Sequence, residues 1–205
     1  MTSRRVVLTG ALAAPLLGLL GQSAHADQTA LYRIIDGWGE ARLTPAAVDR
    51  LRSIGATVYA IEPAVLVGNP SAPTVRMPLD SGKFNRDFTK VIGAIAGGFG
   101  LRTVSRDAHV TKIAGSLSGT SGKGSFTVNN EQVNIGPLYT DMRNEAVISV
   151  EQGPPGYPSL VKFEVPLRPT PEAIDLFIRY FGVPLFSTDM YVAHASGQCR
   201  FLSAS

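Results

Sequence analysis

The sequence predicts a mainly β protein, a β-sandwich or barrel-like fold with two short flanking helices. Most of the chain consists of short runs rich in β-branched residues. These runs are separated by Gly-, Pro- or Asn-rich stretches such as GNPSAP and GPPGYP, which are typical of turns. Only two segments carry the signals of a helix start and a helix stop. Short strands at this spacing favour a sandwich or a barrel, and an α+β fold is the alternative.

The clearest strand is SLVKFEVPLR, in which Val161, Phe163 and Val165 alternate with Lys162 and Glu164. This period of two predicts one buried and one solvent-facing side. Further strands are expected in ATVYAIEPAVLVG, TVRMPL, KVIGAIAG, LRTVSR, HVTKIAGSLSG, SFTVNNEQVNIG, AVISVEQ and MYVAHASGQCRF. Within SFTVNNEQVNIG, the VNNE run at residues 128–131 predicts a tight hairpin turn.

Two segments, LTPAAVDRLRSIGA and PTPEAIDLFIRYFGV, carry matching helix signals. Each has a threonine N-cap, a proline at the first helical position and a glycine at the C-terminal end: Thr44, Pro45 and Gly55, then Thr170, Pro171 and Gly182. Apolar residues share one face of each helix: Val48, Leu51 and Ile54, then Ile174, Phe177, Ile178 and Phe181. We expect both faces to pack on the sheet. An internal duplication and shared capping chemistry both explain the likeness.

The first 26 residues have the pattern of an export signal. Arg4 and Arg5 form a positive n-region, and an apolar run of about 15 residues follows, too short to span a membrane comfortably. A small-x-small cleavage site ends at Ala26. The stretch SRRVVL is similar to the twin-arginine signal that the Tat translocase recognises, with an ordinary Sec signal as the alternative. We therefore expect residues 27–205 to form a single β-rich domain that is secreted or extracytoplasmic, with cell-envelope association left open.

The net charge argues against one class of partner, and the cysteine content indicates where the chain folds. Removal of residues 1–26 takes away two arginines and no acidic residue, so the formal charge falls from +3 to +1. Because Lys and Arg are scattered among Asp and Glu, no nucleic-acid partner is expected. The single cysteine, Cys199, excludes an intramolecular disulfide, which suits a protein folded in the reducing cytoplasm before export. Cofactor loading and fast folding are two common reasons for such a route.

The motifs that would indicate an enzyme or a metal site are incomplete. GTSGKGS, at residues 119–125, lacks the spacing of a phosphate-binding loop and is expected to be a flexible hairpin loop, and there is no G-x-S-x-G. A lone D-S-G at Asp80 lacks the second carboxylate that aspartic proteases need. His109, Met190, His194 and Cys199 are blue-copper ligand types, but their order along the last segment is reversed. No catalytic or metal-binding residue is therefore predicted; for an enzyme, Asp80 and His109 would be the first candidates.

Three stretches, LTPAAVDRLRSIGATVYAIEPA, MPLDSGKF and AIAGGFGLR, resemble a set of secreted β-rich actinobacterial proteins similar to HtaA-type haem-uptake domains. The resemblance covers residues 40–105 and implies a β-sandwich, an exported setting and a haem-like ligand. Haem domains of this type use tyrosine and histidine around a sandwich pocket. Phe99 in GGFGL stands near the place where they usually carry a histidine.

Taken with this resemblance, the sequence predicts an exported, non-enzymatic binding or cell-surface protein for an apolar or haem-like small ligand. The alternatives are a small secreted hydrolase or oxidoreductase and a structural envelope protein. The candidate ligand-binding residues are His109, Tyr139 and His194, and further candidates are Tyr32, Tyr157 and Tyr180. A binding protein predicts an apolar pocket with few polar groups, whereas an enzyme predicts a carboxylate or histidine of perturbed pKa. Cofactor and oligomeric state stay open, with haem the cofactor that the resemblance implies.

Overall fold

The computed structural model describes residues 4–7, 31–85, 90–118, 121–135, 147–154 and 157–202. These residues form a mainly β fold with two helices, as predicted. The helices are α1 (Pro45–Ser53) and α3 (Pro171–Phe181). The strands are β1 (Arg4–Val7), β2 (Leu31–Leu43), β3 (Thr57–Ile61), β4 (Val65–Val67), β5 (Thr74–Asn85), β6 (Lys90–Ile95), β7 (Gly98–Arg102), β8 (Asp107–Ser118), β9 (Ser121–Val128), β10 (Glu131–Ile135), β11 (Val147–Glu151), β12 (Ser159–Leu167) and β13 (Ala193–Leu202).

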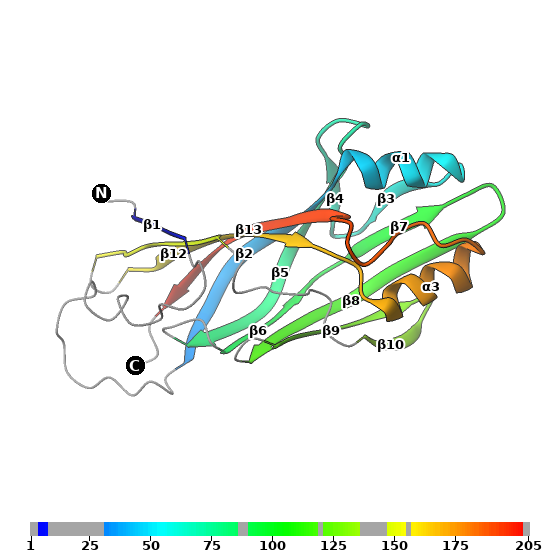
Figure 1. Cartoon of the computed structure of the whole chain (residues 1–205). Coiled ribbons are helices and arrows are strands. Elements are labelled where there is room, and N and C mark those ends of the chain that lie inside the picture. Colours follow the sequence, from blue (N-terminus) through cyan, green and yellow to red (C-terminus); the bar gives the residue numbers. More distant parts are fainter. Residues whose placement is uncertain are drawn as a thin grey trace.

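The described strands pair antiparallel in one large sheet. Its order is β1-β11-β12-β13-β2-β5-β6-β8-β7-β3, with β9 and β10 continuing from β8 and β4 pairing with β5. In Figure 1 the strands β12, β13 and β2 form one layer, and β6, β8, β9 and β10 form another. The passage from β2 to β5 joins the two layers. The arrangement is sandwich-like, which confirms the predicted fold class.

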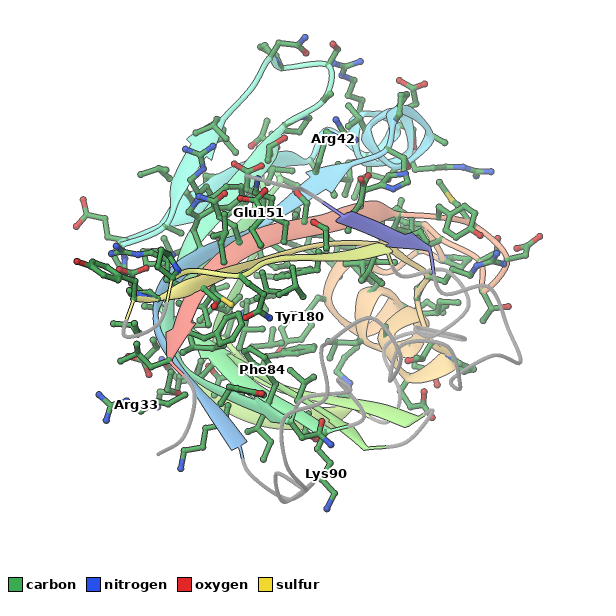
Figure 2. The ribbon with its side chains drawn as sticks, turned by 90° about the vertical axis from the view of Figure 1, so that its left-hand side faces the viewer. Arg33, Arg42, Phe84, Lys90, Glu151 and Tyr180 are labelled. Atoms are coloured by element: carbon green, nitrogen blue, oxygen red, sulfur yellow. The ribbon has the colours of Figure 1, made fainter. Side chains whose placement is uncertain are left out.

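The space between the layers is filled by side chains from both. Phe84 of β5 packs with Val161, Cys199 and Phe201 from the opposite layer, and Phe84 and Phe201 meet edge-on at 4.9 Å between ring centroids. Figure 2 shows Phe84 inside and Arg33 directed outward. Burial raises the pKa of the Cys199 thiol to about 12, so Cys199 is a packing residue.

Both helices begin and end where their capping signals predict. Thr44 accepts a hydrogen bond from the Ala47 backbone N–H at 3.2 Å, and Thr170 accepts one from Ala173 at 3.3 Å. Gly182 ends α3 in the left-handed conformation, φ 79°, which a glycine adopts without a steric penalty.

The predicted apolar faces are buried in α1 and only partly buried in α3. Val48 and Leu51 are almost fully buried. In α3, Phe177 and Phe181 pack against the core, but Ile178 is 39% exposed, so its predicted burial is wrong. Phe186 meets Phe177 edge-on at 4.8 Å, so the segment after α3 fills core space that the helix would otherwise occupy.

Strand predictions were confirmed for most segments and wrong at two places. The VNNE hairpin is confirmed, with Glu131 paired to Val128 and φ of 49° and 71° at the two asparagines. LRTVSR is not a strand throughout, because β7 ends at Arg102 and a turn over residues 103–106 leads into β8. The glycine-rich run over residues 121–125, expected to be a loop, lies within β9.

The predicted export signal is described only in part. Arg4 and Arg5 lie in β1, whose backbone pairs with β11. The predicted cleavage residue, Ala26, lies outside the described residues, so the signal and its removal stay predictions. Within the described ranges, neither helix has the length and apolar character needed to cross a membrane.

Candidate functional site

The register of three neighbouring strands places Tyr59, Gly100 and His109 in one row. Tyr59 of β3 lies opposite Gly100 of β7, and Gly100 lies opposite His109 of β8. The adjacent row, Val58, Leu101 and Ala108, contributes to the buried side of the sheet. Because side chains alternate along a strand, Tyr59 and His109 lie on the opposite, outer face.

The absence of a side chain at Gly100 leaves space for the Tyr59 ring on the outer face of β7. A Cβ atom at Gly100 would overlap the Tyr59 ring, so the ring lies directly across the bare backbone of β7. From there it meets the His109 imidazole edge-on, with 5.9 Å between centroids and 89° between planes. A phenol oxygen and an imidazole are thus brought together from residues 50 positions apart.

A neighbouring pair completes the polar cluster. Arg102 of β7 lies opposite Asp107 of β8, and its Nε donates to the Asp107 carboxylate at 2.7 Å. The Arg102 guanidinium also lies over the Tyr59 ring, 4.7 Å from its centroid. Asp107 accepts the Tyr59 hydroxyl at 2.5 Å and lies 3.3 Å from His109 Nε2. One carboxylate therefore holds three different side chains.

The contacts within the cluster set the charge states of Tyr59 and Asp107. Burial, and then the hydrogen bond to Asp107, raises the pKa of Tyr59 to about 12. The Tyr59 hydrogen bond, followed by those from Arg102 and His109, lowers the pKa of the Asp107 carboxyl. At neutral pH the phenol is therefore protonated and the carboxylate is ionised. The His109 side chain is half exposed, so this face of the sheet is open to a ligand.

The hairpin turn between β9 and β10 holds His109 in place. Asn129 accepts the His109 backbone N–H at 2.8 Å through its side-chain oxygen. Its side-chain nitrogen donates to the Asp107 carbonyl at 3.0 Å. The predicted turn therefore has a role beyond reversing the chain, because it clamps the segment that presents both side chains.

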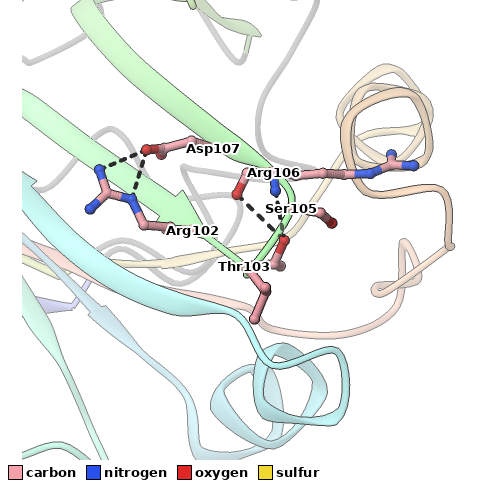
Figure 3. A pocket seen from close by; sticks show the side chains of 6 residues that line it. Arg102, Thr103, Ser105, Arg106 and Asp107 are labelled. Carbon is pink, nitrogen blue, oxygen red and sulfur yellow. Dashed lines mark hydrogen bonds and ion pairs between the residues drawn. The ribbon is translucent and has the colours of Figure 1, made fainter.

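A hollow of about 260 Å³ lies at the turn beside this cluster, lined by residues 102–107. Figure 3 shows that its two arginines point apart: Arg102 turns back to Asp107, whereas Arg106 extends toward α3. Their charges do not converge on one point in the hollow. The turn is therefore a rim of the Tyr59 cluster (Tyr59, Arg102, Asp107 and His109) and not a second site.

The other predicted ligand-binding residues have separate locations. His194 of β13 stacks on Tyr191, with 6.4 Å between centroids, and no described contact joins it to His109. Tyr139 lies outside the described residues. Tyr32 packs between the layers against Phe84, and Tyr157 is exposed at 68%. Tyr180 accepts Arg106 through its backbone oxygen. Of the predicted residues that the structure describes, the cluster contains only His109, and sequence reasoning missed Tyr59, Arg102 and Asp107.

The chain is similar to solved structures, whereas no family model matches it and no curated protein matches it in sequence. The C-terminal domain of HtaA from Corynebacterium glutamicum covers 83% of this chain and 99% of its own, with a TM-score of 0.54 and 9% identity. The chain has the HtaA domain fold. Heme-binding protein HtaB from the same organism covers 85% of this chain and 98% of its own, with a TM-score of 0.46 and 10% identity.

The HtaA fold confirms the architecture that the resemblance implied. Phe99 does not occupy the outer face: it packs inward against the cluster around Val75 and Met77. The imidazole on the outer face comes from the next strand, at His109. The phenylalanine in GGFGL therefore leaves the polar cluster intact.

Proposed function

We propose that this chain is an exported, non-enzymatic haem-binding protein in which Tyr59 is the iron ligand and His109 lies at its side. One observation carries the proposal: the Tyr59 phenol and the His109 imidazole share one row on the open face of β3, β7 and β8. Tyrosine oxygen and histidine nitrogen are both axial ligands of haem iron in proteins.

The surroundings of the pair fit a flat, anionic ligand. Gly98 and Gly100 are alternate residues of β7, and the Tyr59 ring at Gly100 and the Val110 backbone at Gly98 lie where a Cβ atom would be, so no β7 side chain rises between them and a ligand. Arg102 lies at the margin, paired with Asp107, and a guanidinium N–H group left over from that pair could donate to a haem carboxylate. Asp107 Oδ1 accepts the Tyr59 hydroxyl and would orient the phenol oxygen that is the proposed ligand.

The export signal fits the same function. A protein that meets haem outside the cytoplasm needs to be exported, and the twin-arginine pattern at Arg4 and Arg5 would supply the route through the Tat translocase. The fold that the chain shares with an HtaA domain agrees with the resemblance to haem-uptake domains in its sequence. Haem is then the cargo of the site, and the chain's residues only bind and orient it.

A small hydrolase is the second candidate, because His109 and Asp107 form an imidazole–carboxylate pair. Such chemistry needs a nucleophile next to the histidine. No described serine, threonine or cysteine side chain hydrogen-bonds to the His109 ring. The haem proposal uses Tyr59 and the hydrolase does not, so a change at Tyr59 separates the two.

The test is a titration of the purified exported protein with haemin, followed by the Soret band, in wild type and in Tyr59→Phe. We expect one haem per chain, and Tyr59→Phe to lower the affinity by about 100-fold, the upper range for groups that tune a metal site. Tyr191→Phe is the matched control, because Tyr191 also lies beside a histidine and under an arginine. A wild-type chain that binds no haem overturns the function; equal losses in both variants overturn the assigned site.

A further inference from the structure

The turn between β7 and β8 and the end of α3 form a single tip of the molecule. Arg106 Nη1 donates to the Tyr180 carbonyl at 2.7 Å, and its guanidinium lies close to Gly182. This contact fixes the turn against the C-terminal end of the helix. Figure 1 shows both elements at the same end, on the right.

Apolar side chains protrude at this tip. Val104, two residues before Arg106, is fully exposed at the apex of the turn. Ile178 and Val183 lie close in sequence to Tyr180 and Gly182, the residues that the Arg106 guanidinium approaches, and they are 39% and 37% exposed. No residue of α3 is fully buried, although the helix sequence is strongly apolar, whereas the shorter α1 buries three of its residues. Solvent-facing valine and isoleucine on two adjoining elements suggest that something covers them.

The charges around these side chains are positive. Arg106 and Arg179 are both exposed at the tip and bring cations next to Val104 and Ile178. Of the α3 carboxylates, Glu172 lies in the first turn of the helix, whereas Asp175 lies one helical turn before Ile178 and Arg179, so the two arginines exceed the nearby α3 carboxylates by one charge. Exposed apolar side chains next to two arginines are complementary to a surface with an anionic outer layer and an apolar interior.

We propose that this tip, made of Val104, Arg106, Ile178, Arg179 and Val183, docks the protein on an anionic lipid surface. Val104, the most exposed side chain of the tip, lies at the end of a hairpin turn. An exposed apolar side chain beside arginines can enter the headgroup layer while the cations meet the lipid phosphates. Docking would also hold the Tyr59 cluster, which includes residues of both strands that the turn connects, close to the membrane.

The experiment measures co-sedimentation of the exported protein with vesicles in the absence of haem, so it is independent of the proposed haem function. We expect binding to vesicles containing phosphatidylglycerol, little binding to phosphatidylcholine alone, and loss of binding as salt rises from about 0.05 M to 0.5 M. Val104→Asp should weaken binding by about tenfold or more, because it replaces an apolar side chain that would enter the lipid surface with a charge that the anionic surface repels.

Leu66→Asp is the matched control, since Leu66 of β4 is an exposed apolar residue at 47% and lies outside the tip. It should leave vesicle binding unchanged, and both variants should keep the wild-type unfolding transition because both sites are exposed. Equal losses in the two variants, or no binding of the wild type, would overturn the proposal. If Val104→Asp instead abolishes self-association of the wild type, the tip is an interface between copies and the lipid assignment is wrong.

Discussion

Two clusters of a tyrosine, a histidine and an arginine lie in different regions of the molecule. The Tyr59 cluster is on the outer face of β3, β7 and β8. A second one, the Tyr191 cluster, consists of Tyr191, His194 and Arg168. In both, the guanidinium covers the tyrosine ring, at 4.7 Å from the centroid in the first and 4.1 Å in the second. In both, the histidine ring lies beside the tyrosine.

The tyrosine hydroxyls have opposite roles in the two clusters. Tyr59 donates to a carboxylate, Asp107, and meets its histidine edge-on. Tyr191 accepts a hydrogen bond from Arg168, and its ring lies within 30° of the plane of its histidine. Its backbone carbonyl also accepts the Thr44 hydroxyl at 2.8 Å, which ties the start of α1 to this segment.

The comparison teaches that residue type alone does not mark a binding site. A tyrosine that accepts from an arginine and anchors a helix cap contributes to the fold. A tyrosine that lies over a glycine and donates to a carboxylate that is 32% exposed has an oxygen that can be redirected to a ligand. Three predictions test this division, from the largest expected effect to the smallest.

The first prediction concerns the glycine under the Tyr59 ring. Gly100→Ala should displace the ring, because the new Cβ would overlap the far end of this side chain. We expect haem affinity to fall about 10- to 100-fold, the range for groups that orient a metal ligand. The stability of the fold should change little, since a side chain moves and the backbone stays. Soret titration and urea unfolding measure the two quantities.

Gly39→Ala is the control for this change. Gly39 is also a strand glycine, but a Cβ there has its nearest neighbour at 4.0 Å. Affinity and stability should both stay near wild type. Loss of haem affinity in Gly39→Ala, or full affinity in Gly100→Ala, would remove the argument that the bare backbone of β7 sets the Tyr59 ring.

The second prediction compares the two arginines. Arg168→Gln should lower the free energy of unfolding by roughly 1–2 kcal/mol, because Arg168 is part-buried, covers the Tyr191 ring and donates to its hydroxyl. Arg102→Gln should cost less than about 1 kcal/mol, because its ion pair with Asp107 is largely exposed. Urea unfolding of both variants measures the two free energies. A larger loss of stability for Arg102→Gln would mean that the Tyr59 cluster, and not the Tyr191 cluster, stabilises the fold.

Much of the fold could be predicted because local signals specify it. The threonine and proline at each helix start and the two asparagines of the β9–β10 turn act within a few residues. Strand β2 was missed because its glycines and charges look like a loop. Gly37 is in fact required there, since a Cβ would collide with Cys199 on the neighbouring strand. That requirement depends on a residue 162 positions away.

The site could be predicted only at His109, for a related reason. Tyr59 becomes a partner of His109 through two successive strand registers, β3 with β7 and β7 with β8. No local pattern encodes these registers. The alternation in TVYAI and the glycines in GGFGL were visible, but their outward faces meet only once the sheet is formed.

The third prediction compares Asp36 and Asp107, two carboxylates whose pKa their partners hold low. Asp36 owes its lowered pKa first to the hydrogen bond from Arg200, whereas Asp107 owes its own first to Tyr59 and then to Arg102. A carboxyl with a lower pKa in the folded state stabilises the fold above its unfolded value of 3.8 and loses that contribution as pH falls through the folded pKa.

The pH dependence of Tm therefore shows which side chain lowers the pKa of each carboxyl group. We compare Tm at roughly pH 6 and pH 3 without ligand, where each change should be small because both pairs are exposed. Arg200→Gln should reduce the acid-induced drop in Tm, since Asp36 loses the group that lowers its pKa. Arg102→Gln should reduce it less than Tyr59→Phe, because the tyrosine is the main partner of Asp107. The opposite order would mean that Asp107 is held by its arginine and that the Tyr59 hydroxyl is only loosely attached to it.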